Sequence, residues 1–302
     1  TPNGWRMSKA ALTAIGSPSN TQPEFRNTAT PPMKILLLGK NGQVGWELQR
    51  SLQPLGEVMA CDFDSPADRR ANFSEPDAVS ALVTRVRADV IVNAAAHTAV
   101  DKAESEPELA RLINATTPGM IANSAHRLGA LFVHYSTDYV YDGSGDSPRE
   151  ETAATRPLSV YGKTKLEGEE LIRSSGCRHV ILRTSWVYAA RGHNFIKTML
   201  RLDDERDALS VINDQVGAPT GADLLADVTA LTISKLNVGE GASGVYHCVA
   251  RGATSSFEYA RFVIDWARVN GLPVKVASDA IQPISTSAYP TPATRPLNSR
   301  LS

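Results

Sequence analysis

Residues 34–45 have the sequence Lys34-Ile35-Leu36-Leu37-Leu38-Gly39-Lys40-Asn41-Gly42-Gln43-Val44-Gly45. The unbroken apolar run is typical of a strand buried on both faces of a parallel sheet. Gly39 permits a tight turn, Gly42 lets the backbone approach a pyrophosphate, and Gly45 lets the next helix pack close to the strand. Residues 43–55 have the apolar spacing of that helix, whose N-terminus offers free N–H groups to phosphate. The pattern predicts a dinucleotide-binding unit, whereas an ordinary glycine-rich turn would not explain the ordered elements around it.

The second strand is predicted over residues 58–61, and it ends at Asp62. An acid at this position can accept hydrogen bonds from an adenosine ribose, which favours NADH. Arg69 and Arg70 follow shortly afterwards and could accommodate the 2′-phosphate of NADPH. The sequence therefore leaves the choice between NADH and NADPH open.

A tyrosine and a lysine, Tyr161 and Lys165, stand four residues apart within a helix predicted over residues 159–174. Positions i and i+4 lie on one face of a helix. Because an ammonium beside a phenol favours the phenolate, we expect Lys165 to lower the pKa of Tyr161 and prepare it for proton transfer. The same spacing also occurs on surface helices with a half-buried tyrosine and a solvated lysine. Its position after the glycine pattern, and after Thr137 and Asp138, favours the chemical interpretation.

Strand and helix patterns alternate along the chain, which is typical of a doubly wound sheet. Further helices are predicted over residues 75–86 and 107–128, and strands over 90–93, 131–135 and 180–183. Later helices are expected near 224–233 and 257–269, a strand near 245–249, and loops at 211–215, 218–221 and 287–290. The predicted fold class is α/β, a Rossmann-type doubly wound parallel sheet with a small C-terminal α/β substrate lobe.

The sequence predicts that the chain divides into three segments. Residues 1–32 are polar and lack periodicity, which predicts a disordered N-terminal extension. Residues 33–185, with returning segments, are expected to form the NAD(P)-binding Rossmann domain. Residues 186–302 are expected to form mainly a substrate-binding lobe.

Composition narrows the function classes. The formal net charge is -1 and the basic residues are scattered, so no nucleic-acid or polybasic membrane partner is expected. No apolar stretch approaches the ~20 residues that span a bilayer. The three cysteines, Cys61, Cys177 and Cys248, lie far apart without metal-ligand spacing, which predicts reduced thiols in a cytoplasmic protein.

These motifs resemble a known family. The Gly39-x-x-Gly42-x-x-Gly45 pattern, a Thr before an Asp at a strand end, and Tyr161-x-x-x-Lys165 resemble the extended short-chain dehydrogenase/reductases that act on nucleotide sugars. Longer strings carry the resemblance from Met33 to about Ser299: residues 93–101 (NAAAHTAVD), 136–140 (STDYV), 183–188 (RTSWVY) and 213–220 (NDQVGAPT). The resemblance implies reduction of the C4 ketone of dTDP-4-dehydro-L-rhamnose to dTDP-L-rhamnose with NADH or NADPH. That reaction is the last step in making the rhamnose donor for surface polysaccharide.

The resemblance also implies roles for individual residues. Tyr161 would donate the proton to the C4 oxygen, Lys165 would hold the cofactor ribose and tune Tyr161, and Thr137 would hydrogen-bond the reacting oxygen. Thr137, Asp138 and Trp186 would contact the sugar nucleotide, although Asp138 could merely cap a turn and Trp186 could belong to the core. The expected cofactor-binding residues are Gly39, Gly42, Gln43, Val44, Gly45, Asp62, Asn72, Phe73, Ala96, His97, Thr98, Tyr161 and Lys165. For His97 we favour a structural imidazole with a backbone contact to the cofactor.

The chain departs from the family pattern at several positions. Asn72-Phe73 stands where the family often has Asp-Phe, which exchanges a charge for an amide donor at the expected adenine contact. Some relatives hold a magnesium ion between acids at a homodimer interface; Glu47 matches one of those positions, and Asp223 replaces a Glu at another. The third would lie beyond Ser302, where relatives continue for roughly 30 residues by resemblance, so a C-terminal truncation is expected.

Two other functions remain open from the sequence. A nucleotide-sugar 4,6-dehydratase or 4-epimerase could use the same fold, but a dehydratase typically has acidic side chains after the Thr, and here Asp138 is followed by Tyr139. A regulatory subunit that binds a dinucleotide without turnover, as the methionine adenosyltransferase beta subunit does, is the second alternative. The intact Tyr161, Lys165 and Thr137 argue against it.

Overall fold

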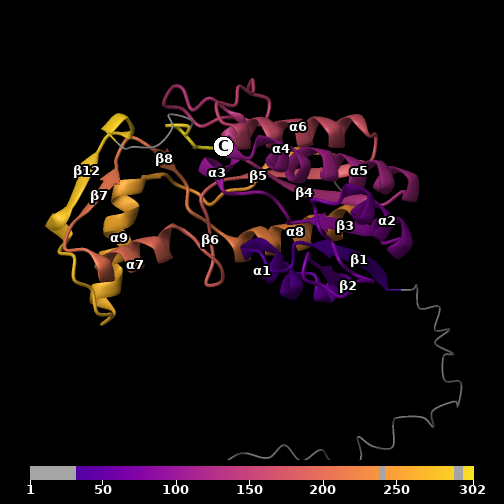
Figure 1. Ribbon diagram of the computed structural model, residues 1–302, viewed down its shortest axis with the longest axis horizontal. Helices are drawn as coiled ribbons and strands as arrows, with labels where there is room; N and C mark the ends of the chain where they lie inside the picture. The colour runs from indigo at the N-terminus through magenta and orange to yellow at the C-terminus, as the bar shows by residue number, and fades with distance from the viewer. Residues whose placement is uncertain (1–31, 238–241, 289–294) are drawn as a thin grey trace, which may run out of the picture. The chain divides into compact units, whose positions relative to one another are not determined.

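A six-stranded parallel sheet forms the centre of the structure, a computed structural model that describes residues 32–237, 242–288 and 295–302. The strand order is β10-β5-β4-β3-β1-β2 (Figure 1). The strands are β1 (Met33–Leu38), β2 (Gly56–Cys61), β3 (Val90–Asn93), β4 (Leu131–Thr137), β5 (Arg178–Thr184) and β10 (Gly244–His247). The predicted Rossmann-type class is confirmed. Apart from Pro32, the predicted extension over residues 1–32 lies outside the described residues.

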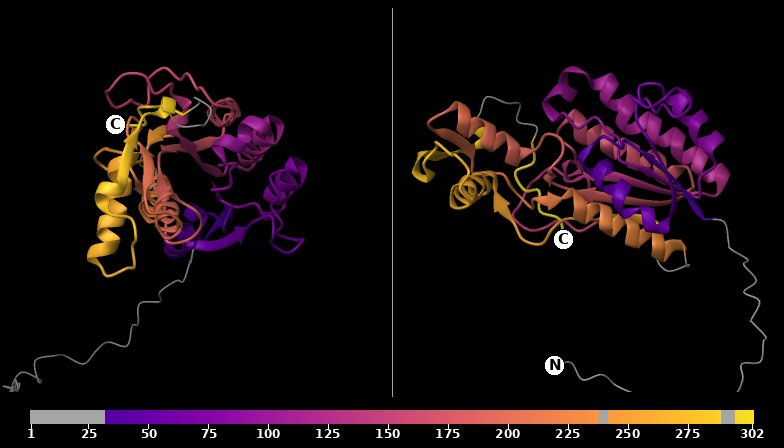
Figure 2. Two further views of the ribbon diagram at one scale, coloured as in Figure 1. Left: turned by 60° about the vertical axis from the view of Figure 1, so that its left-hand side comes forward. Right: turned by 90° about the horizontal axis from the view of Figure 1, so that it is seen from below.

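Helices cover both faces of this sheet. Leu36 and Leu38 of β1 pack into one apolar core, while Ile35 and Leu37 pack into another on the opposite face. This alternation is the two-residue period of a strand that is buried on both sides. The first face is covered by α2 (Pro76–Val86), α5 (Thr117–Leu128) and α6 (Val160–Ser174), and the second by α1 (Gln43–Ser51) and α8 (Ala222–Asn237) (Figures 1 and 2).

The strand order reverses at β1, which pairs with β2 on one side and with β3 on the other. In doubly wound sheets, ligands bind at this switch point, beyond the carboxyl ends of the strands. The loops after β1, β3 and β4 therefore meet where the sequence placed its small and polar residues.

The helix predicted over residues 107–128 contains a π-helical turn. The structure has α4 (Pro107–Arg111), a π-helical turn (Leu112–Thr116) and then α5, and α3 (Val100–Ser105) precedes them. Pro118 lies in the first turn of α5, where its missing N–H is tolerated but disfavours a continuous α-helical ladder. The long helix predicted over residues 107–128 is confirmed, and the π-helical turn within it was not predicted.

The C-terminal third has its own apolar core. It is built from α7 (Phe195–Glu205), β7 (Leu209–Ile212), α9 (Ser256–Val269) and β12 (Ile281–Ile284), with Met199, Val211, Ile264 and Ile281 among its buried members. Short two-residue strands complete it: β6 (Val187–Tyr188), β8 (Val216–Gly217), β9 (Thr220–Gly221) and β11 (Thr254–Ser255). The loops predicted at 211–215 and 218–221 thus include strand residues, and α7 was not predicted. Residues 289–290 of the third predicted loop lie outside the described residues. None of the described helices is long and apolar enough to cross a membrane.

Candidate active site

The three glycines after β1 differ in how much room each leaves for a side chain. Gly39 has φ +85°, and a side chain there would bring its Cβ within 2.5 Å of Ala95 N. A Cβ at Gly45 would collide with the Gly39 carbonyl oxygen. At Gly42, by contrast, a Cβ would lie 3.5 Å from Gly39 O, an ordinary contact. The protein's own packing therefore requires two of the glycines, and the third leaves room for a ligand at the N-terminus of α1.

The first turn of α1 is tied to the C-terminal third. Gln43 Oε1 accepts a hydrogen bond from Asn194 Nδ2 at 3.0 Å, and the Arg191 guanidinium lies 4.0 Å from the Trp46 ring centroid. Because the Gln43 side chain has this partner, Gln43 and Val44 would contact a cofactor through main-chain N–H groups at the helix N-terminus.

Asp62 has a structural role in the described chain. Its carboxylate accepts hydrogen bonds from Asn41 N at 2.9 Å and from Phe63 N at 2.8 Å, and the residue is buried. These bonds join the end of β2 to the glycine-rich loop. The expected contact with a ribose stays a prediction.

Asn72 and Phe73 also have partners within the protein. Asn72 donates to Glu75 Oε1 at 2.7 Å and accepts from Ser74, so its side chain closes the turn before α2. The Phe73 side chain is buried in the apolar core, and its carbonyl oxygen accepts from Thr117 Oγ1 at 2.8 Å. The expected adenine contact of these residues is not tested.

The loop containing Ala96, His97 and Thr98 is held by Asn114. Asn114 Oδ1 accepts from His97 N at 2.8 Å, and Asn114 Nδ2 donates to His97 O at 3.1 Å. The His97 ring contacts Glu106 Oε2 at 3.6 Å through Nε2. This arrangement agrees with a structural imidazole and a main chain held beside the switch point. Thr98 lines the cleft described next.

A cleft of about 470 Å³ opens beside these loops, and Thr98, Tyr139, Tyr161, Trp186 and Arg295 are among its lining residues. The Tyr161 ring meets Tyr139 edge-on, with centroids 5.4 Å apart. Burial raises the pKa of Tyr161, and a hydrogen bond with the Thr137 hydroxyl only partly opposes this effect. The phenol therefore keeps its proton at neutral pH.

Lys165 does not have the expected effect on Tyr161. Its Nζ donates to Tyr135 O at 2.6 Å and lies 3.1 Å from His134 Nε2. Burial lowers the pKa of Lys165 to about 8. The prediction that Lys165 lowers the pKa of Tyr161 was wrong for this structure, because burial raises the pKa of Tyr161 and Lys165 is not among the groups that shift it.

Thr137 ends β4 and Asp138 follows it, and the two residues are 4% and 2% exposed. Thr137 Oγ1 donates to Asp138 Oδ1 at 2.9 Å and accepts from Tyr139 N at 3.2 Å. Burial raises the pKa of Asp138 to about 6. Its Oδ2 is buried with no hydrogen-bond partner among the described residues. Thr137, not Asp138, caps the turn, and a side-chain hydrogen bond with Ser299 also acts on the Asp138 carboxyl. Contact between Asp138 and a substrate stays a prediction.

Trp186 belongs both to the core and to the cleft. Its ring stacks near Tyr259 with centroids 6.4 Å apart, and it has the unusual φ of +47°. A Cβ at Gly217 would lie 2.5 Å from Trp186 Cε2, which explains the glycine at that position. Trp186 thus packs against the apolar core of the C-terminal third and also lines the cleft. Its contact with a sugar nucleotide stays a prediction.

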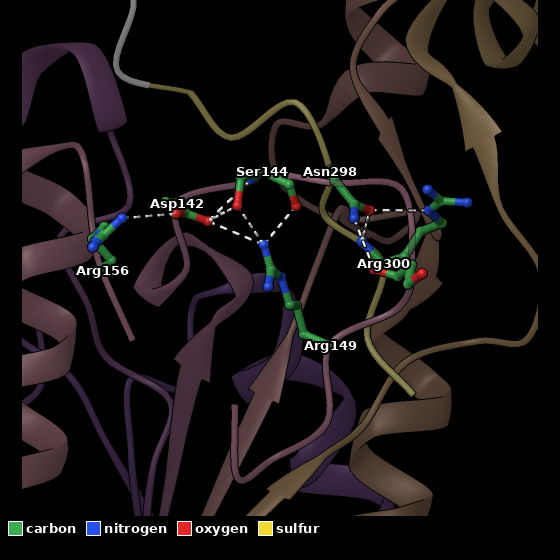
Figure 3. Close-up of polar contacts among 7 residues, drawn as sticks. Asp142, Ser144, Arg149, Arg156, Asn298 and Arg300 are labelled. Carbon is green, nitrogen blue, oxygen red and sulfur yellow. Dashed lines mark hydrogen bonds and ion pairs between the residues drawn. The ribbon is translucent and has the colours of Figure 1, made fainter. Parts of the chain in front are cut away.

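The last described residues are clamped onto the loop after β4 (Figure 3). Arg149 Nη2 donates to Asp142 Oδ1 at 3.1 Å and to Ser144 Oγ at 2.8 Å, while Arg149 N donates to Arg300 O at 2.9 Å. The Asn298 side chain accepts from Arg300 Nε at 2.9 Å. The bond from Arg149 N to Arg300 O, with those from Asn298 to Gly143 O and Ser147 O, joins residues 295–302 to this loop.

Arg295 lies at one end of this segment. It donates to Asp101 Oδ2 at 2.7 Å, and its guanidinium hydrogen-bonds Tyr139. Sequence reasoning missed Arg295, since an arginine in a Pro-rich segment carries no spacing signal.

The expected magnesium ligands do not form a site within the described chain. Glu47 lies 3.7 Å from Arg50 in an ion pair, and Asp223 lies in the first turn of α8. No group of three or more acidic, histidine or cysteine side chains among the described residues could hold a metal ion. The residues present do not fit magnesium on their own, and the ion and the homodimer stay predictions.

Comparison with known proteins agrees with this geometry. The RmlD substrate binding domain model matches residues 33–302. The dTDP-4-dehydrorhamnose reductase of Salmonella typhimurium (strain LT2) is 59% identical over 270 residues, 89% of each chain. The chain belongs to the family that the RmlD substrate binding domain model describes. The Escherichia coli K12 enzyme of the same name is 56% identical over 269 residues, again 89% of each chain. A Bacillus anthracis dTDP-4-dehydrorhamnose reductase solved in complex with NADP has a TM-score of 0.78 and 33% identity, over 89% of this chain and 90% of that one.

Three further buried polar residues were missed from the sequence: Asn114, His134 and Glu169. Pro118 was a signal that the helix around Asn114 is irregular. Glu169 stands four residues after Lys165, on the same helix face. His134 lies in a strand whose apolar neighbours predicted burial, which is itself a reason to ask for its partners.

Proposed function

We infer that the protein is an NAD(P)H-dependent dTDP-4-dehydrorhamnose reductase, which reduces the C4 ketone of dTDP-4-dehydro-L-rhamnose to dTDP-L-rhamnose. The observation that carries this inference is the buried Tyr161, which packs edge-on against Tyr139 and lines a cleft together with Thr98 of the loop after β3. The family relationship supplies the substrate.

The chemistry assigns one role to the cofactor and others to the chain. Bound NAD(P)H would supply the hydride, with its phosphates at Gly42 and the N-terminus of α1. We propose that Tyr161 gives its proton to the substrate oxygen and that Thr137 orients the phenol. Because ketone reduction needs a proton donor, the raised pKa of Tyr161 keeps the useful form populated across neutral pH.

A second cavity supports the proposal that the C-terminal third binds the substrate. It has a volume of about 910 Å³ and shares Phe195, Gln215, Ser256 and Arg295 with the cleft. Arg201, Arg206 and Arg295 line it, and no carboxylate does so among the described residues. Although Arg201 and Arg295 also pair with Glu205 and Asp101, the three guanidinium groups suit the nucleoside diphosphate of a sugar nucleotide.

Three further assignments complete the proposal. The cofactor can be NADH or NADPH, and the NADP bound to the B. anthracis relative favours testing NADPH first. The three cysteines are free and buried, which supports the cytoplasm as the place of action. We also propose that residues 33–185 bind the cofactor and residues 186–302 mainly the sugar nucleotide.

The test follows the absorbance of NADPH, and separately of NADH, with dTDP-4-dehydrorhamnose. We expect substrate-dependent loss of reduced cofactor, and Tyr161→Phe should lower kcat by ~10² or more while cofactor binding persists. Tyr139→Phe is the matched control, since it removes a neighbouring phenol hydroxyl and should lower kcat much less.

Two outcomes would contradict the reductase. A changed sugar without net loss of reduced cofactor would indicate a dehydratase or an epimerase. Cofactor binding without turnover in the wild type would indicate a regulatory module.

A further inference from the structure

The end of β2 presents two carboxylates to the glycine-rich loop. Asp62 and Asp64 lie on either side of Phe63, directly after β2. Asn41 of the glycine-rich loop contacts both acids: its main-chain N–H donates to Asp62 Oδ2 at 2.9 Å, and its Nδ2 lies 2.9 Å from each oxygen of Asp64. Dinucleotide-binding sheets receive the adenosine ribose at this place, between the glycine-rich loop and the end of the second strand. The charge of the two acids therefore acts on whatever group the ribose carries at its 2′ position.

The two carboxylates differ in what they can still bind. Asp62 is 9% exposed, and each of its oxygens already has a main-chain donor, Asn41 N for Oδ2 and Phe63 N for Oδ1. Its carboxylate is thus used to hold the glycine-rich loop against β2. Asp64 is exposed, and the one amide group of Asn41 leaves its two oxygens with further acceptor capacity. Asp64 is therefore the carboxylate that a ligand at this edge would meet.

A tight turn fixes the position of Asp64. Ser65 N donates to Asp62 O at 3.2 Å, and Ser65 Oγ accepts from Asp62 N at 2.9 Å. Phe63 and Asp64 are the two central residues of this turn. The Phe63 side chain is 61% exposed and offers a flat apolar face suited to a purine ring. Because both the turn and Asn41 hold Asp64, its carboxylate would lose contacts if it moved away from a ligand.

One of the arginines that could accommodate a 2′-phosphate has other partners. The Arg69 guanidinium pairs with Asp68 at 3.5 Å, and it lines a pocket of about 310 Å³ together with Lys34 and Glu57. Lys34 and Glu57 are paired near the amino ends of β1 and β2, whereas a dinucleotide binds at the carboxyl ends. Lys40 belongs to the glycine-rich loop itself. It is therefore the cation whose effect has to be separated from that of Asp64.

We propose that Asp64 is a specificity-determining residue that makes the protein bind NADH in preference to NADPH. The ribose 2′-hydroxyl of NADH can donate a hydrogen bond to a carboxylate, whereas the 2′-phosphate of NADPH has a negative charge that a carboxylate repels. The contact between Asn41 and Asp64 adds to the discrimination, because it keeps the carboxylate at the loop. This proposal rests on the proposed NAD(P)H-dependent function and concerns its cofactor site alone.

The first test measures cofactor affinity without substrate, from the fluorescence of bound NADH and bound NADPH. At low salt we expect NADH to bind the wild type about tenfold or more tighter than NADPH, the size of one like-charge contact near a protein surface. The difference should shrink at about 1 M salt, because exposed charges are then screened. If NADPH binds as tightly as NADH at low salt, the proposal is overturned.

Two fragments isolate the 2′-phosphate from the rest of the cofactor. Adenosine 5′-monophosphate and adenosine 2′,5′-bisphosphate differ only in that group, and each can displace NADH from the wild type. We expect the bisphosphate to be the weaker competitor. A bisphosphate that competes more strongly would mean that the site attracts the 2′-phosphate, which contradicts the proposed role of Asp64.

Asp64→Asn removes the charge and keeps an acceptor for Asn41. We expect it to strengthen NADPH binding by about tenfold and to change NADH binding by less than about threefold. Retained NADH binding also shows that the variant is folded. Asp68→Asn is the matched control, since Asp68 is an exposed acid of the same segment that pairs with Arg69. It should leave the ratio of the two affinities unchanged, and equal effects of both variants would overturn the assignment to Asp64.

Lys40→Met tests the competing cation. NADH should remain the favoured cofactor in this variant, whereas a wild-type preference for NADPH that Lys40→Met removes would make Lys40 the determinant. Because these measurements need no substrate, they are independent of turnover. The expected affinity ratio in a protein that reduces no ketone would contradict the proposed function alone, and equal affinities in an active reductase would contradict only the role of Asp64.

Discussion

Asp138→Asn should make the protein more stable at neutral pH. The carboxyl is 2% exposed, and burial raises its pKa from 3.8 to about 6. A folded-state pKa above the unfolded value adds stability below pH 3.8 that is lost as the pH rises through about 6. At about 1.4 kcal/mol per pH unit, the charged Asp138 costs up to about 3 kcal/mol at pH 7.5. Asn keeps the acceptor for Thr137 and removes this charge. The gain corresponds to about 5 °C in Tm for a chain of this size.

Urea unfolding at several pH values between 4 and 7.5, followed by circular dichroism, measures this effect. The advantage of Asp138→Asn should be largest at pH 7.5 and should shrink as the pH falls through 6 toward 4. Asp142→Asn is the control with the opposite sign, because hydrogen bonds from Ser144 hold the pKa of Asp142 below its ordinary value. It should therefore destabilise the protein at neutral pH. If Asp138→Asn is no more stable than the wild type at pH 7.5, or if its gain is the same at every pH, the reasoning is refuted.

Two further pairs of variants test the phosphate loop and the buried ion pair. Gly42→Ala should leave the Tm nearly unchanged but weaken NADPH binding by tenfold or more in a fluorescence titration, whereas Gly45→Ala should lower the Tm because its Cβ meets the Gly39 carbonyl. If both variants lose stability equally, Gly42 has a structural role. Arg183→Met should cost about 3–5 kcal/mol in urea unfolding because it leaves Glu169 buried without its partner, and adding Glu169→Leu should recover most of this loss. Failure of the double variant to recover would mean that Arg183 contributes mainly through its other contacts.

The regular elements around the sheet were predictable because each has a local signal. The apolar run of β1 and the glycines after it specify a strand, a turn and a helix. Ser159 is the N-cap of α6, and its side chain accepts a hydrogen bond from Gly162 N at 3.0 Å. The C-terminal third was harder. Its β7 and β12 pair with each other although 68 residues separate Ile212 from Ile281, and such short strands carry little sequence signal of their own.

The candidate site shows the same division between local and non-local information. Spacing placed Tyr161 and Lys165 on one helix face, but it could not show that both would be desolvated. Their pKa directions therefore depend on packing that the sequence does not reveal. Asp62 illustrates the same limit, because its bond to Asn41 N depends on how β2 lies beside the glycine loop.

The ion pair beneath the site explains how the reacting groups are held in register. Glu169, on the same helix as Tyr161, binds Arg183 of β5 through both of its oxygens, at 2.9 and 2.6 Å, and also accepts from Ser136 of β4. Arg183 donates in turn to Tyr141 Oη at 2.7 Å. Apolar packing alone would tolerate small slides of α6 along the sheet, whereas a two-point charged contact has one geometry. Buried pairs add little net stability compared with apolar substitutes. We therefore attribute this one to position, since it holds the helix of Tyr161 to β5, while the Ser136 bond of the same carboxylate holds that helix to the strand that ends in Thr137.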